Sequence, residues 1–178
     1  RDQRSFPLLL PLLDQPCPVE RMSAVYALGR NPCPSAVQKL VGLLKTDDNA
    51  YVRRATAWSL ANYDNQIVLE PLINALKNDV AAVRLWSSSS LAEIGNVSLE
   101  NAQLVAEQLL VSLKIDNESG VRSNCIWSLC RLYEKLNNAF QESFIDECTK
   151  IALFDKEPSV MEEAKTALDS MGMQGFYN

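Results

Sequence analysis

Residues 52–60 read VRRATAWSL and residues 121–129 read VRSNCIWSL, so Val, Arg, Trp, Ser and Leu recur at the same places in both stretches. A phrase that one chain carries twice indicates an internal structural repeat. Three further stretches follow the pattern more loosely: 20–28 (ERMSAVYAL), 83–91 (VRLWSSSSL) and 160–168 (VMEEAKTAL). Their closing leucines recur every 31 to 39 residues, a period typical of repeats built from two helices.

A second apolar pattern precedes these phrases, for example AVQKLVGLLKTD at 36–47 and IVLEPLINALKND at 67–79. Its apolar residues are spaced by three and four, which predicts an amphipathic helix. Each such segment ends near an Asp, and the helix with the repeated phrase starts a few residues later; the five are Asp14, Asp48, Asp79, Asp116 and Asp155. Gly29 and Gly95 are predicted to stop the second helix of their pairs.

These patterns predict an all-α protein, an α-solenoid of about five antiparallel helix pairs with almost no strand. One pair cannot bury its apolar stripe alone, whereas stacked pairs form a continuous core. We expect a single repeat domain, 1–178, with repeats at approximately 5–30, 35–63, 66–96, 98–137 and 139–171. The last two repeats are longer, and we assign their extra residues to 96–103 and 135–142.

The pattern D…VRxxAxxxL, followed by LAEIG at 91–95 in the third repeat, resembles HEAT-like repeats and implies an armadillo-like superhelix. The short repeats are most similar to those of cyanobacterial phycobilin lyases and their relatives, and the resemblance covers the whole chain. It implies a subunit or helper of a lyase that handles a bilin, with a phycobiliprotein or a second HEAT-like subunit as partner. Met161 stands where the pattern has Arg, and no lyase active-site motif can be carried over to this chain.

Successive residues of an α-helix are rotated by about 100°, and this rotation assigns the residues of each second helix to different faces. Val52, Thr56, Ser59 and Leu60 then share one face, which we expect to pack against the first helix of the pair. The place before the closing Leu is small in every repeat, which predicts a close approach of two helices; its occupants are Ala27, Ser59, Ser90, Ser128 and Ala167. The serine run at 87–90 is interpreted as packing residues and solvated hydroxyls and not as nucleophiles.

The second place of the phrase holds Arg in four repeats: Arg21, Arg53, Arg84 and Arg122. The planar guanidinium group has five donors, which suits carboxylates and backbone carbonyls. We expect these arginines to form a ladder of bonds to Asp residues in the turns. The alternative is a row of arginines that binds an anionic ligand.

The face turned away from the first helix is expected to line the concave surface of the solenoid. Its candidate groove for a partner or ligand comprises Met22, Tyr26, Arg54, Trp58, Leu85, Trp86, Ser89, Ser123, Trp127 and Cys130. Trp, Tyr and Arg are the usual anchors of protein interfaces. The alternative is that the rings tilt sideways and fill gaps between repeats.

The composition argues against several classes of site. The chain has no His, five Cys and a formal net charge of −5. Without His or a C-x-x-C pair, we assign no catalytic residue and no metal ligand. We expect no nucleic-acid partner because no basic stripe stands out, and no membrane insertion because no apolar run approaches the roughly 20 residues that cross a bilayer. The odd number of Cys fits a reducing cytoplasm.

The cysteines divide by their expected surroundings. Cys125 and Cys148 are predicted to be buried, and Cys130 to reach the groove. Cys17 and Cys33 each lie between two prolines and are predicted to be exposed in turns. A role as an iron–sulfur accessory factor has only the number of cysteines in its favour.

Two hypotheses for function follow. The leading one is a non-catalytic scaffold or adaptor, without a cofactor, that holds a partner protein in the groove. The alternative, which follows from the resemblance, is a subunit or helper of a phycobilin lyase, with a bilin as ligand.

Overall fold

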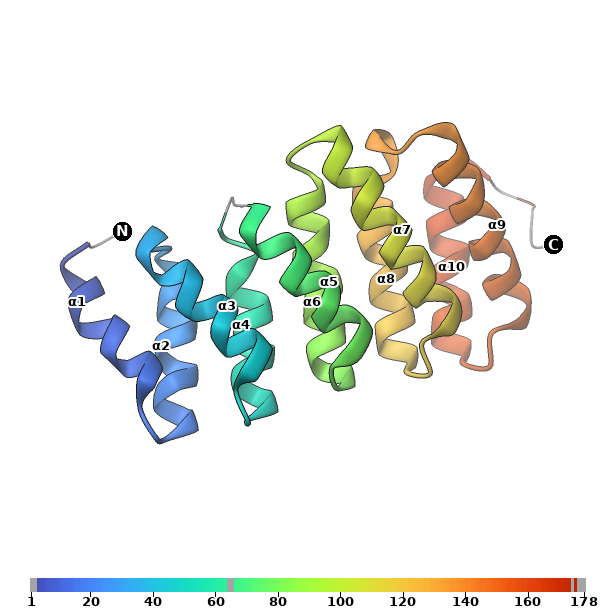
Figure 1. The fold of residues 1–178 in the computed structure, drawn as a ribbon. Helices are drawn as coiled ribbons and strands as arrows, with labels where there is room; N and C mark the ends of the chain where they lie inside the picture. The colour runs from blue at the N-terminus through green and yellow to red at the C-terminus, as the bar shows by residue number, and fades with distance from the viewer. Residues whose placement is uncertain (1–2, 64–65, 174, 176–178) are drawn as a thin grey trace. The chain divides into compact units, whose positions relative to one another are not determined.

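The computed structural model describes residues 3–63, 66–173 and 175, and every regular element among them is helical, as predicted (Figure 1). Ten α-helices within this part of the chain form five successive pairs, which confirms the α-solenoid. None of the helices in the described ranges is long and apolar enough to cross a membrane. The chain divides into two compact units, residues 1–91 and 92–178, and each is considered by itself.

The first unit stacks helix pairs in two rows. Its elements are α1 (Phe6–Leu9) with the 3₁₀ turns Gln3–Ser5 and Leu10–Asp14, α2 (Pro18–Arg30), α3 (Val37–Thr46) after the turn Pro34–Ala36, α4 (Ala50–Leu60), α5 (Leu69–Asn78) after the turn Gln66–Val68, and the start of α6 (Ala81–Gly95). The first helices of the pairs, A helices, form one row, in which α3 packs against α5 (Figure 1). The second helices, B helices, form the other, in which α2 packs against α4.

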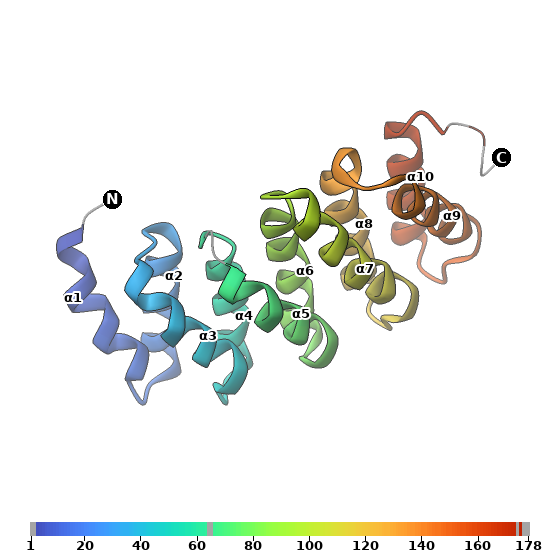
Figure 2. The ribbon, with the colours of Figure 1, turned by 45° about the horizontal axis from the view of Figure 1, so that its top comes forward.

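The second unit follows the same plan with longer A helices. It contains the end of α6, then α7 (Leu99–Ile115), α8 (Ser119–Leu132), the turn Tyr133–Lys135, α9 (Asn138–Phe154) and α10 (Pro158–Ser170). The A helices α7 and α9 pack against each other, as do the B helices α8 and α10 (Figure 2). Both A helices have 17 residues, whereas α3 and α5 have 10. The extra residues of the last two repeats therefore lengthen the A helices at their N-terminal ends.

The face that the copies of the repeated phrase share is buried in both units. Val52, Thr56, Ser59 and Leu60 have no exposed surface, and the matching residues of α8 are buried too. The small residue before the closing Leu of each phrase does not face the A helix alone, however. Ser90 donates a hydrogen bond of 2.7 Å to the carbonyl of Ala57 in the preceding B helix. The small residues thus allow consecutive B helices to approach, which corrects the expectation that they serve only the A–B contact of one pair.

Gly29 is part of the same close approach and does not stop its helix. Helix α2 continues to Arg30, and Gly29 is fully helical and buried. A Cβ built on Gly29 would lie 2.6 Å from Cζ3 of Trp58 and 3.2 Å from the Cα of Ser59. The prediction of a stop signal at Gly29 was wrong because the residue is required by helix packing. Helix α6, in contrast, does end at Gly95.

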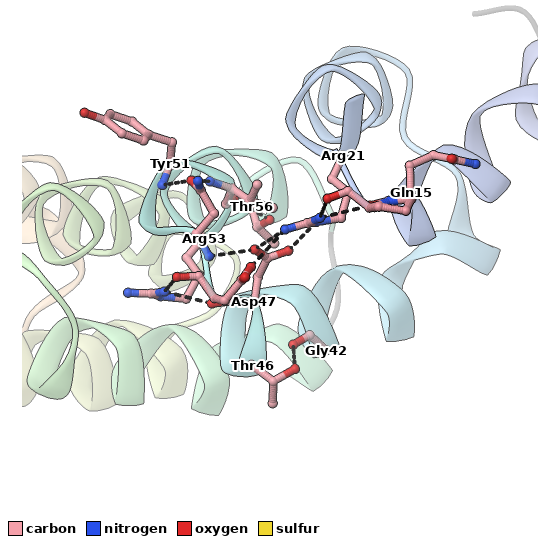
Figure 3. Close-up of polar contacts among 12 residues, drawn as sticks. Gln15, Arg21, Gly42, Thr46, Asp47, Tyr51, Arg53 and Thr56 are labelled. Carbon is pink, nitrogen blue, oxygen red and sulfur yellow. Dashed lines mark hydrogen bonds and ion pairs between the residues drawn. The ribbon is translucent and has the colours of Figure 1, made fainter. Parts of the chain in front are cut away.

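Three arginines of the phrase, Arg21, Arg53 and Arg122, bind aspartate carboxylates, as predicted. Figure 3 shows the first two of them beside Asp47. Arg21 binds both carboxylate oxygens of Asp47, with 2.8 Å from Nε and 2.9 Å from Nη2. Its Nη1 donates to the carbonyl of Gln15 at 2.9 Å. One guanidinium group therefore ties the turn before its own helix to the turn of the next repeat. The acceptor is Asp47, which is nearly buried, and not mainly Asp48, whose side chain is 93% exposed.

Guanidinium groups of later repeats form bonds of the same kind to Asp carboxylates and backbone carbonyls. Arg53 donates to the carbonyl of Asp47 at 2.8 Å and to both carboxylate oxygens of Asp79, and Arg84 donates to the carbonyl of Asp79 at 2.8 Å. In the second unit, Arg122 binds both carboxylate oxygens of Asp155 at 2.8 and 2.6 Å. Bidentate pairs of this kind fix geometry as well as adding energy, so these arginines act in the structure of the array.

Candidate functional site

The helix-B face of the first unit carries most of the predicted groove residues. Met22 and Tyr26 come from α2, Arg54 and Trp58 from α4, and Leu85, Trp86 and Ser89 from α6. Six of these seven are half-buried and Trp86 is 37% exposed, so none is sealed in the core. Successive B helices therefore present aromatic and polar groups on one accessible face.

Five of the side chains on this face converge on a pocket of about 180 Å³. Its lining consists of Tyr26, Arg30, Arg54, Trp58 and Trp86. We call this the aromatic–arginine pocket. Met22, Leu85 and Ser89 lie on the same face but do not line it. Arg30 was not among the groove residues predicted from the sequence. It follows Tyr26 by four residues, the spacing at which helical side chains are neighbours.

Trp58 has two contacts that connect the pocket with the packing of the repeats. Its ring lies against Gly29, and its centroid is 5.4 Å from that of Tyr26 with a tilt of 56°. Tilted rings at this distance attract each other. One side of the Trp58 ring fills the gap between α2 and α4, as the packing alternative expects, and the other side lines the pocket.

Arg54 is held in place by aromatic rings and not by a carboxylate. Its guanidinium carbon lies 5.4 Å from the centroid of the Tyr51 ring, a cation–π arrangement. Its Nη2 is 3.5 Å from the hydroxyl oxygen of Tyr26. Its Nε is buried and has no acceptor within the part of the chain that the structure describes. Burying a polar N–H without an acceptor costs free energy, so an acceptor that reached this group would be favoured.

The charges of the pocket contrast with those of the chain. The chain carries a formal net charge of −5, but the pocket is lined by two arginines and no carboxylate. Neither Arg30 nor Arg54 forms an ion pair with any residue in the described ranges. Arg21, Arg53 and Arg122, in contrast, are each paired with an aspartate carboxylate. The pocket is therefore a local positive site with aromatic walls.

The helix-B face of the second unit carries the other three predicted residues, Ser123, Trp127 and Cys130 on α8. Trp127 is 41% exposed, and the guanidinium carbon of Arg131 lies 4.9 Å from its ring centroid. Arg131 also forms an ion pair of 2.6 Å with Glu93. The Trp–Arg pair thus recurs in this unit, but here the arginine has a carboxylate partner.

The model of the family described as HEAT repeats matches residues 6–92 and again residues 39–130. The chain belongs to the HEAT-repeat family. No curated protein matches its sequence. Among solved structures, a chain of the complex of CpcE and CpcF of phycocyanin lyase from Nostoc sp. PCC7120 is similar, with a TM-score of 0.72 and 21% identity over 93% of this chain and 99% of that one.

Designed repeat proteins share the fold as well. A designed armadillo repeat protein in complex with the peptide (KR)4 has a TM-score of 0.65 and 20% identity, over 96% of this HEAT-repeat chain and 89% of that chain. An engineered protein has a TM-score of 0.66 and 23% identity, over 90% and 78% of the two chains. At these identities the likeness establishes the fold alone.

Three cysteines of the HEAT-repeat chain lie as predicted, and one does not. Cys125 and Cys148 are buried and Cys17 is exposed, but Cys33 is buried as well. The backbone N–H of Cys33 donates to the hydroxyl of Tyr63 at 3.3 Å, so Tyr63, itself buried, contacts the linker after α2. No group of three His, Cys, Asp or Glu residues suited to a metal was found in the described ranges.

The remaining groove residue, Cys130, is half-buried. Burial raises the pKa of its thiol to about 11, with a smaller contribution from Glu163. A thiol with such a pKa is almost entirely protonated near neutral pH, and the thiolate is the nucleophilic form. Cys130 is therefore a poor nucleophile on this face.

The serine run at 87–90 also differs in part from the prediction. Three of its hydroxyls, those of Ser87, Ser88 and Ser90, belong to buried residues and are not solvated. Ser88 and Ser90 donate to backbone carbonyls at 2.7 Å. The run therefore serves packing, as expected, but from inside the array.

Proposed function

We propose that this HEAT-repeat protein is a non-catalytic scaffold or adaptor that holds a partner protein on its helix-B face. The observation that carries the proposal is the aromatic–arginine pocket, which gathers the residue types that dominate protein interfaces. Its lining groups are rings and guanidinium groups, which suit binding and not proton transfer. The odd number of cysteines supports a cytoplasmic location for this role, as argued from the sequence.

The size of the pocket favours a side chain of a protein over a whole cofactor. Sites for small molecules typically enclose about 300–1,000 Å³, whereas this pocket has about 180 Å³. It suits one anchoring side chain, with the rest of the partner lying across the neighbouring helices. Interfaces commonly combine such an anchor with a surrounding surface of weaker contacts.

Recovery of partners from a lysate of the source organism tests the proposal. The wild-type chain is compared with the double variant Trp58→Ala/Trp127→Ala, which removes the ring from the helix-B face of each unit. Phe154→Ala serves as the matched control, because this ring is 80% exposed but lies at the end of an A helix. We expect the same proteins with wild type and control and their loss with the double variant. Equal recovery by all three chains would contradict binding through this face.

A second candidate is a subunit or helper of a phycobilin lyase. The observation in its favour is the likeness to a chain of the phycocyanin lyase complex, which matches almost from end to end. A bilin could place one ring or carboxylate in the pocket while most of it lay outside. Titration with a bilin, followed by its absorbance and by Trp fluorescence, tests this idea. An unchanged spectrum at high micromolar bilin would exclude direct binding of the chromophore.

A further inference from the structure

We infer that the aromatic–arginine pocket recognises an acidic segment of the partner protein, an inference that rests on the proposed function. A carboxylate of the segment pairs with Arg54 and Arg30, and an adjacent apolar side chain packs against the rings of Trp58 and Trp86. The specificity of the site is then set by charge and not by apolar contact alone.

The first argument is the state of the two arginines. Arg21, Arg53 and Arg122 are each bound to an aspartate carboxylate. Arg30 and Arg54, in contrast, have no carboxylate partner among the described residues. Arg54 is pre-positioned by the ring of Tyr51 and the hydroxyl of Tyr26. Its guanidinium group therefore loses little freedom when an acceptor arrives, which favours binding.

The second argument excludes the opposite charge. Three aromatic rings in one pocket would also suit an organic cation, since cations bind to the faces of rings. Two guanidinium groups in the same lining repel such a ligand. An apolar side chain would cover the buried Nε of Arg54 without offering it an acceptor, and a neutral polar one would leave both guanidinium charges unpaired. An anionic group both accepts from the arginines and compensates their charge, and it leaves the rings for its neighbour.

The third argument is the source of the anion. The pocket is one small depression on a face of stacked helices, and its volume of about 180 Å³ matches a side chain. A small inorganic anion would use the arginines but not the exposed ring of Trp86. An acidic residue next to an apolar one uses both, which favours a protein segment as the occupant.

Three short peptides of equal length test the inference, each with a central Phe flanked by Glu, by Gln or by Lys residues. Binding to the full chain is measured by calorimetry and by Trp fluorescence. We expect the Glu peptide to bind at least about tenfold more tightly than the Gln peptide and the Lys peptide to bind most weakly. Raising NaCl from about 50 to about 500 mM should weaken only the Glu peptide strongly, because salt screens exposed charges.

The variant Arg30→Gln/Arg54→Gln should remove the preference for Glu. Lys45→Gln/Lys77→Gln is the matched control, because it changes the charge equally at exposed residues of the A helices α3 and α5. Should the first variant fold poorly, Arg30→Gln alone, at an exposed residue, should still reduce the preference.

Tighter binding of the Lys peptide, equal binding of all three peptides, or no binding of any of them would each overturn the inference. None of these results decides whether the helix-B face holds a partner, because that is decided by the recovery of proteins with Trp58→Ala/Trp127→Ala. A designed armadillo relative was solved with the basic peptide (KR)4. The arginines here predict the reverse preference on the same kind of fold.

Discussion

The ring of Trp58 occupies the space that a side chain at Gly29 would need. A Cβ on Gly29 would lie 2.6 Å from Cζ3 of Trp58, well inside van der Waals contact. Tyr26 lies beside the same ring, with centroids 5.4 Å apart, and limits its movement. The approach of α2 to α4 and the shape of the aromatic–arginine pocket therefore depend on the same pair of residues.

Gly29→Ala should consequently destabilise the protein. Overpacking a tight contact typically costs about 1–3 kcal/mol. Moving the ring of Trp58 alone would not relieve it, because the Cα of Ser59 also lies only 3.2 Å from the added Cβ. Gly42→Ala is the matched control, because Gly42 is also helical but has no atom within 4 Å of an added Cβ. It should stabilise the chain by about 0.5–1 kcal/mol, as Ala favours a helix interior. Urea unfolding of both variants measures the difference; loss of stability in both would refute the packing argument.

Trp58→Ala and Trp127→Ala should destabilise the protein to different extents, although both residues occupy the same place in the repeated phrase. Trp58 packs against Gly29 and Tyr26, whereas Trp127 is 41% exposed and contacts a surface arginine. Removal of a buried Trp costs about 3–5 kcal/mol, so the half-buried Trp58 should cost roughly 1–3 kcal/mol and Trp127 less than about 1 kcal/mol. Thermal melting tests the order of the two. A smaller effect at Trp58 would restore the simpler view of a ring that stands open to a partner.

The helix pairs were predictable because their pattern is local. Apolar spacing, the Asp at the end of each A helix and the Arg of the phrase are features of a few residues each, and every copy strengthens the others. The error at Gly29 has the opposite origin. Its role is decided by Trp58, a residue of the next repeat, and a glycine near a helix end has the same sequence signal whether it stops a helix or admits a neighbour.

The candidate site was predictable in part for the same reason. Periodicity placed Tyr26, Arg54 and Trp58 on one face, but the convergence of Arg30 with Trp86 depends on how α2, α4 and α6 pack. The burial of Cys33 under Tyr63 likewise joins two linkers that are distant in sequence. Such contacts between two repeats produce no recognisable residue spacing within either repeat.

Arg122→Ala should cost far more than Arg131→Ala. The side chains of Arg122 and Asp155 are 6% and 7% exposed, and removing one partner leaves a buried charge. Such a loss costs about 3–5 kcal/mol. The Arg131–Glu93 pair is 40% and 44% exposed, and pairs of that kind contribute about 0–1 kcal/mol. Urea midpoints compare the two, and Arg122→Lys should not rescue the first, since Lys cannot form the bidentate pair.

Among the five cysteines, Cys17 should be the one that an aromatic disulfide reagent labels rapidly in the native protein. It is exposed, whereas Cys33, Cys125 and Cys148 are buried, and burial raises the pKa of Cys148 as well as that of Cys130. Both effects suppress the reactive thiolate. Mass spectrometry after brief labelling near neutral pH identifies the site, and Cys17→Ser should abolish the rapid phase. Rapid labelling at Cys33 would show that Tyr63 does not protect it.

The ladder aspartates should make stability fall in acid. Burial by itself would raise the pKa of Asp79, but hydrogen bonds from Arg53 and from the N–H of Val80 outweigh it, and the pKa is lowered. A carboxyl with a lowered folded pKa stabilises above its unfolded value of about 3.9 and loses that contribution as pH falls through the folded pKa. Wild type should therefore lose more unfolding free energy between about pH 5 and pH 2 than Asp79→Asn, with about 1.4 kcal/mol for each unit of lowering. The exposed substitution Asp48→Asn should leave the urea midpoint at neutral pH nearly unchanged. Identical acid profiles for wild type and Asp79→Asn would show that the Arg53–Asp79 pair contributes nothing in this range.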